Sequence, residues 1–68
     1  MSVTAIVNGE SRRLAEGTTI AQLLRDFGIE GSGVAVARNE CVVRGALFES
    51  EAVRDGDVIE IIRAVAGG

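Results

Sequence analysis

The sequence predicts a small α+β fold in which a mixed sheet of four to five strands carries one main helix on one face. Three features lead to this prediction. The chain opens with a β-rich run that ends at the turn pair Asn8-Gly9, one amphipathic stripe follows over residues 20–27, and a long apolar run lies over residues 58–65. A single helix with a narrow apolar face covers only one side of a small sheet, so the other side is expected to stay open.

The first predicted element is a β-hairpin. Residues 3–7 are rich in β-branched side chains and run into Asn8-Gly9, the pair that best tolerates the positive φ angles of a two-residue turn. Residues 10–14 are expected to return antiparallel to them. If the odd-numbered side chains of the first strand face inward, Ile6 faces the open side of the sheet.

The second predicted element is a helix over residues 20–27. Thr19 is its expected N-cap, because Gln22 three residues later completes a capping-box pattern. Four apolar residues at spacing i, i+3, i+4 and i+7 form one stripe: Ile20, Leu23, Leu24 and Phe27. Gly28 is the expected left-handed residue after the helix, with the next residue folding back as in a Schellman motif.

The remaining elements follow from short apolar runs and turn signals. Strands are predicted over residues 34–37 and 41–43, and residues 44–53 are expected to be irregular with one helical turn. A turn at 54–57 then leads into the last strand, over 58–65. The first and last strands are the most continuous apolar ones, so we expect them to be central neighbours in the sheet.

Length and composition exclude most enzyme chemistry. The 68 residues are expected to form a single domain, 1–68, with little room for an enclosed pocket. The chain has no His, the commonest metal ligand, and its one Cys can form neither an internal disulfide nor a thiolate metal cluster. We therefore predict that the chain is not an enzyme, that it has no catalytic residue and no metal site, and that it binds no cofactor itself.

Charge and hydropathy argue against two further classes of partner. Ten acidic residues outweigh seven basic ones, which are all Arg, and two Phe are the only aromatic residues. Nucleic-acid binding requires a basic stripe with stacking aromatics, so no nucleic-acid partner is expected. No apolar run is long enough to span a bilayer, and the first residues lack a secretory pattern. We expect no membrane partner and a cytoplasmic location.

The chain ends in Gly67-Gly68, and the α-carboxylate of Gly68 is the candidate functional group. Two consecutive glycines make a thin, conformationally free thread that can enter a narrow active site of another protein. We therefore expect a flexible tail over 64–68 that presents Ala66, Gly67 and Gly68 to partner enzymes. The competing interpretation is a frayed terminus without function.

Five groups of residues follow one another along the chain: Asn8-Gly9-Glu10; Gly17-Thr18-Thr19-Ile20 with Leu23-Leu24; Gly33-Val34-Ala35-Val36 with Asn39; Asp55-Gly56-Asp57 with Ile59-Glu60-Ile61; and Val65-Ala66-Gly67-Gly68. Each group is common by itself. In this order and at this length, they resemble the motifs of the ubiquitin-like β-grasp sulfur carriers, and in particular the ThiS-type family of thiamine thiazole biosynthesis. The resemblance covers essentially the whole chain and implies a β-grasp fold.

The resemblance also implies what happens to Gly68. In that family a ThiF-like adenylating enzyme uses ATP and Mg to convert the terminal carboxylate into an acyl-adenylate. A sulfur donor protein then displaces AMP and leaves a thiocarboxylate, which gives its sulfur to a ThiG-like thiazole synthase. The chain would thus be a protein substrate and sulfur carrier, with ATP and Mg belonging to its partner.

Ile6 and Ile62 are the expected docking residues for both partner enzymes, on the open face of the sheet. The competing interpretation is that they are isolated exposed apolar residues, which are normal on protein surfaces. Three positions depart from the family, because relatives commonly carry Pro, Arg and a later Trp where this chain has Arg44, Gly45 and Phe48. That segment is expected to pack in its own way.

Other functions stay open at this level. The small subunit of molybdopterin synthase also ends in Gly-Gly, although the short length and the lack of a proline in the last strand favour the thiazole carrier. A carrier for cysteine synthesis, a ubiquitin-like modifier joined through Gly68, and a plain interaction domain with an incidental tail are further alternatives. Cys41 is expected to be a small buried side chain on a strand, with a part in sulfur handling as its alternative role.

Overall fold

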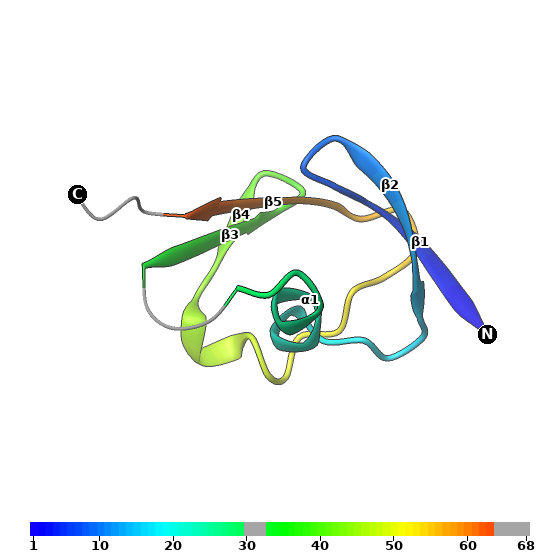
Figure 1. Ribbon diagram of the computed structural model, residues 1–68, viewed down its shortest axis with the longest axis horizontal. Helices are drawn as coiled ribbons and strands as arrows, with labels where there is room; N and C mark the ends of the chain where they lie inside the picture. The colour runs from blue at the N-terminus through cyan, green and yellow to red at the C-terminus, as the bar shows by residue number, and fades with distance from the viewer. Residues whose placement is uncertain (30–32, 64–68) are drawn as a thin grey trace.

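The computed structural model describes residues 1–29 and 33–63, which form a five-stranded sheet and one α-helix (Figure 1). The elements follow the chain as β1 (Ser2–Val7), β2 (Glu10–Ala15), α1 (Ile20–Asp26), β3 (Val34–Arg38), β4 (Cys41–Val43), the short 3-10 helix η1 (Gly45–Leu47) and β5 (Val58–Arg63). Figure 1 shows α1 packed on one face of the sheet. The predicted α+β arrangement is confirmed.

The strands lie in the order β2-β1-β5-β3-β4, so the first and last strands of the chain are neighbours inside the sheet. β1 and β5 run parallel, with Ile6 opposite Val58 and Val7 opposite Ile59. All other pairings are antiparallel, and this single parallel contact makes the sheet mixed. The predicted central position of the two strands is therefore confirmed.

The β1–β2 hairpin turns at Asn8 and Gly9, whose φ angles are 51° and 85°. Both values are left-handed, as a two-residue hairpin turn of this kind requires. β2 extends to Ala15, one residue beyond the predicted end. Ala5 and Val7 are buried and Ile6 is exposed, so the predicted alternation along β1 is confirmed.

Helix α1 has both predicted caps. The Thr19 hydroxyl accepts from the Gln22 backbone N–H at 3.2 Å, and the Gln22 side chain accepts from the Thr19 N–H at 3.1 Å. At the other end Gly28 has a φ of 74°, and the Ile29 N–H donates to the Leu24 carbonyl at 2.9 Å, as in a Schellman motif. The helix ends at Asp26, one residue earlier than predicted.

The core lies between α1 and the sheet. It contains ten buried apolar residues: Ala5, Val7, Ile20, Leu23, Leu24, Ile29, Val36, Val53, Ile59 and Ile61. Fully burying a side chain the size of Leu or Ile contributes about 1.5–3 kcal/mol. The helix is only seven residues long and would not be stable alone, so packing against this core is what keeps it folded.

The segment over residues 44–57 supplies hydrogen-bond acceptors to the first turn of the helix. The first helical N–H groups have no partner inside a helix. The Glu51 carbonyl accepts from Ile20 N–H at 3.0 Å, and the Phe48 carbonyl accepts from Ala21 N–H at 2.9 Å. Val53, which belongs to this segment, is buried in the core. The helical turn expected in this stretch is the 3-10 helix η1.

A partly buried polar network ties the same segment to the sheet. The Arg38 guanidinium contacts the Glu51 carboxylate at 2.6 Å and donates to the Ala52 carbonyl at 3.0 Å. The buried Asp57 carboxylate accepts from Arg54 N–H at 2.9 Å and from the Asn39 side-chain amide at 3.1 Å. These bonds fix the turn from which β5 begins.

Candidate functional site

The predicted reactive tail, residues 64–68 with Ala66, Gly67 and Gly68, lies outside the described residues. The structure does describe the strand that leads to it. β5 lies between β1 and β3, and its pairing with β3 continues to Arg63, which is opposite Val34. The chain therefore reaches residue 63 on a strand that is held within the sheet.

The face of the sheet opposite α1 carries exposed apolar side chains. We call Ile6, Val42, Val58 and Ile62 the open-face patch; all four are exposed. Val58 and Ile62 alternate along β5 with Ile59 and Ile61, which are buried on the helix side, and Ile6 lies opposite Val58. Val42 lies opposite Ala37, which in turn lies opposite Glu60 of β5, so Val42 belongs to the same face. Among the described residues, no helix or loop covers this face (Figure 1).

Both predicted docking residues belong to the open-face patch, but they are not in contact. Ile6 pairs with Val58 across the parallel β1–β5 contact. Ile62 lies four residues further along β5, roughly 13 Å away at the usual rise of a strand. Val58 and Val42 were missed by sequence reasoning, although strict alternation along β5 would have identified Val58 together with Ile62.

Two carboxylates border the patch. Glu60 lies on β5 between Val58 and Ile62, and Glu40 lies in the β3–β4 turn. Together with Asn39 and Val58, they line an open hollow of about 370 Å³. The open-face patch thus has an acidic border near the β3–β4 turn.

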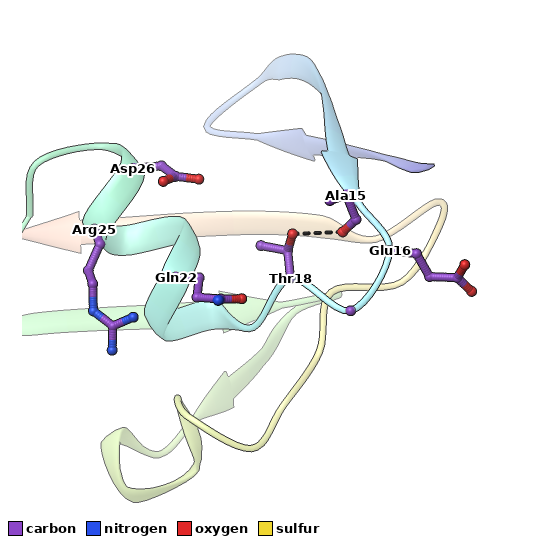
Figure 2. A pocket seen from close by; sticks show the side chains of 7 residues that line it. Ala15, Glu16, Thr18, Gln22, Arg25 and Asp26 are labelled. Atoms are coloured by element: carbon purple, nitrogen blue, oxygen red, sulfur yellow. Dashed lines mark hydrogen bonds between the residues drawn. The ribbon is translucent and has the colours of Figure 1, made fainter. Parts of the chain in front are cut away.

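A second hollow, of about 530 Å³, lies beside the helix (Figure 2). Figure 2 shows Gln22 and Asp26 on α1 extending towards the turn that follows β2, where the Thr18 hydroxyl donates to the Ala15 carbonyl at 2.6 Å. The charged side chains are exposed, and Arg25 pairs with Glu49 at 3.1 Å on the surface. This solvent-exposed hollow holds no arrangement of groups suited to catalysis.

Within residues 1–29 and 33–63, no group of three or more His, Cys, Asp or Glu side chains is close enough to hold a metal ion. In the same ranges no helix has the length and apolar character needed to cross a bilayer.

Cys41 is exposed, so the prediction that it is buried was wrong. It begins β4, which is an edge strand with β3 on one side only. It pairs with Arg38 right after the turn, and an edge position so close to a turn has few neighbours to cover it. A part for Cys41 in sulfur handling stays a prediction.

Comparison with known proteins gives a consistent result. The ThiS family model matches residues 5–68. The chain is 42% identical over 62 residues to the sulfur carrier protein ThiS of Thermus thermophilus, covering 91% of this chain and 95% of that protein. It is 30% identical over 63 residues to the sulfur carrier protein ThiS of Escherichia coli, covering 93% of this chain and 96% of that protein.

A longer relative and a solved structure add to this. The chain is 36% identical over 63 residues to a thiazole synthase of Paramagnetospirillum magneticum, covering 93% of this chain but only 19% of that protein. The crystal structure of the thiamine biosynthesis protein ThiS from Geobacter metallireducens is similar to the fold with a TM-score of 0.79 and 28% identity, covering 97% of this chain and all of that one. The predicted β-grasp fold is confirmed.

Proposed function

The chain belongs to the ThiS family, and on this premise we propose that it is a sulfur carrier whose reactive group is the α-carboxylate of Gly68. The observation that carries the proposal is its similarity to a sulfur carrier protein over nearly the full length of both chains. The chain acts as a protein substrate and carrier, and the catalysis belongs to its partners.

The carboxylate of Gly68 must be activated before it can accept sulfur. A carboxylate is a poor electrophile because its negative charge is delocalised over two oxygens. We propose that a ThiF-like enzyme joins one of these oxygens to the α-phosphorus of ATP and releases pyrophosphate, with Mg stabilising the phosphate charge. A sulfur donor protein then delivers sulfur at the oxidation level of sulfide. A C–S bond forms, the C–O bond to AMP breaks, and a thiocarboxylate remains.

The proposed acceptor of this sulfur is a ThiG-like thiazole synthase. The support comes from two thiazole synthases, each of which has a segment similar to this chain that makes up 19% of its length. When a carrier-like segment and a synthase are joined in one chain, the segment is present at a high effective concentration near the synthase active site. Such an arrangement is useful when the two act on the same reaction.

The test of carrier chemistry is the intact mass of the chain after incubation with an adenylating enzyme, MgATP and a sulfur donor. We expect a mass increase equal to replacement of one oxygen by sulfur. A chain that lacks Gly68 is the control and is expected to keep its mass. An unchanged mass with an enzyme verified on its own cognate carrier would contradict the proposal.

The pathway is tested by complementation. The chain is expected to restore growth of a thiamine auxotroph that lacks its own carrier, and to leave a mutant that lacks the small subunit of molybdopterin synthase unrescued. Rescue of the second mutant alone would reject the thiazole assignment while leaving the thiocarboxylate chemistry in place.

We further propose that the open-face patch is the docking surface for both partner enzymes. Its support is the exposure of four apolar side chains on the face that includes β5, the strand leading to Gly68. Burying such side chains favours association by about 25 cal/mol per Å² of apolar area removed from water. The acidic border at Glu40 and Glu60 would favour partners with basic residues at the rim of their apolar surface.

Ile6→Glu tests the docking surface, with Leu47→Glu as a matched control. Ile6 and Leu47 are 42% and 43% exposed, but Leu47 lies on η1, on the helix side of the sheet. The Ile6 variant is expected to raise the KM of the adenylating enzyme for the chain at least tenfold, whereas the Leu47 variant changes it little. Circular dichroism checks that both are folded. Equal KM values for the two variants would remove the support for this surface.

A further inference from the structure

The parallel contact between β1 and β5 is shorter than β5 itself. Its backbone pairs are Ile6 with Val58 and Val7 with Ile59, after which β1 ends and the chain turns away. The Asn8 N–H still donates to the Ile59 carbonyl at 2.9 Å. The part of β5 nearest the tail therefore extends beyond the backbone of its parallel neighbour.

The side chain of Asn8 continues the contact. Its Oδ1 accepts from the Ile61 N–H at 2.8 Å. In a regular parallel ladder, this N–H would donate to the main-chain carbonyl of the residue at position 8. Asn8 has entered a left-handed turn with a φ of 51°, and its side-chain oxygen takes the place of that carbonyl.

The bond matters because it is partly buried inside the sheet. Ile61 is 9% exposed, and removing the partner of a poorly solvated N–H is costly. On the other side, β3 holds β5 up to Arg63. Among the described hydrogen bonds, the one that Asn8 accepts from Ile61 is the only one between the β1–β2 hairpin and β5 beyond Ile59.

We propose that Asn8 is a positioning residue for the carrier reaction, which holds the base of the tail so that Gly68 is directed into a partner's active site. This inference rests on the proposed function. Without the bond, the end of β5 is held from one side only. The last residues of β5 then adopt more conformations in the free chain. Fixing them when Gly68 enters the partner's active site costs more conformational entropy, and this cost raises the barrier of the chemical step.

Two substitutions at Asn8 separate the turn from the hydrogen bond. Asn8→Gly keeps a residue that adopts left-handed φ readily but removes the acceptor. Asn8→Asp keeps both the acceptor oxygen and the tolerance of left-handed φ. Asp55→Ala is the matched control, because the Asp55 carboxylate accepts from the Thr4 N–H at 2.8 Å and makes no hydrogen bond with the end of β5 near Ile61.

The first measurement is hydrogen exchange followed by NMR, well below the unfolding temperature. We expect the Ile61 amide to exchange about five- to tenfold faster in Asn8→Gly, the change that corresponds to loss of one ordinary hydrogen bond. The core amide of Val36 serves as the reference for global opening. Asn8→Asp is expected to restore slow exchange, whereas Asp55→Ala leaves the relative rate at Ile61 unchanged.

The second measurement is the rate of adenylation by the activating enzyme. Asn8→Gly is expected to lower kcat about five- to tenfold with KM nearly unchanged, because the open-face patch is intact. Asn8→Asp is expected to restore kcat, and Asp55→Ala to keep it. A normal kcat in Asn8→Gly, or an equal loss in Asp55→Ala, overturns the inference. If the wild-type chain takes no adenylate, the proposed function fails, and the inference that rests on it fails as well.

Discussion

At the scale of single residues, the two β-hairpins both need positive φ angles in their turns, but they use different residues to provide them. The β1–β2 turn uses Asn8 and Gly9, whereas the β3–β4 turn uses Asn39 and Glu40 with φ angles of 52° and 72°. A residue with a Cβ is strained at positive φ by about 1–2 kcal/mol, and Asn is one of the few that tolerate it. The strain of the second turn is therefore concentrated at Glu40.

Glu40→Gly is expected to raise the free energy of unfolding by about 0.5–1 kcal/mol, since relief of strain exceeds the entropy cost of glycine. Urea denaturation measures the change. Gly9→Ala is the control with the opposite sign. It should lower stability by about 1 kcal/mol through backbone strain alone, because no atom lies within 4 Å of the added Cβ. A lower urea midpoint for Glu40→Gly would contradict this account.

At the scale of elements, α1 depends on contacts beyond its own seven residues. Its first N–H groups are satisfied by the Thr19 hydroxyl and by carbonyls of Phe48 and Glu51, which come from a distant part of the chain. The capping box is local, whereas the carbonyl contacts exist only after the chain has folded back on the helix. Helix formation and docking of residues 44–57 should therefore occur together.

Thr19→Ala is expected to lower the free energy of unfolding by about 1 kcal/mol, because the Gln22 N–H loses its partner at the start of the helix. Thermal unfolding followed by circular dichroism measures the effect. Thr19→Ser keeps the hydroxyl and should remain close to the wild-type value. If both variants unfold at the same temperature, the capping bond does not contribute as proposed.

At the scale of the whole molecule, stability rests on a small core. A chain of 68 residues is expected to have a free energy of unfolding of about 3–10 kcal/mol. Leu23 is fully buried between α1 and the sheet. Truncating a buried Leu to Ala lowers the free energy of unfolding by about 2–5 kcal/mol, so one such change removes a large share of the stability of this small protein.

Leu23→Ala is thus expected to leave the protein partly unfolded or barely folded near physiological temperature. Leu47→Ala removes the same atoms from an exposed position on η1 and should cost less than about 1 kcal/mol. Urea denaturation of the two variants compares them. Similar midpoints would mean that Leu23 is not a principal core residue.

Much of the fold could be predicted from the sequence because its signals are local. The stripe that begins at Ile20, the capping pair of Thr19 and Gln22, and the turn at Asn8-Gly9 depend on residues close together in the chain. The exposure of Cys41 was predicted wrongly because it depends on β4 being an edge strand. Strict alternation along β5 would have placed Val58 on the face of Ile62, but its position beside Ile6 depends on the register between β1 and β5.

The sequence by itself determined the order of the elements, the family motifs and the candidate group at Gly68, since each follows from neighbouring residues or from a linear pattern. Only the tertiary structure decided that the segment over 44–57 completes the start of the helix and that Asn8 holds Ile61, which lies 53 positions away. A contact across such a distance depends on the strand order, and a pattern of neighbouring residues carries no information about it.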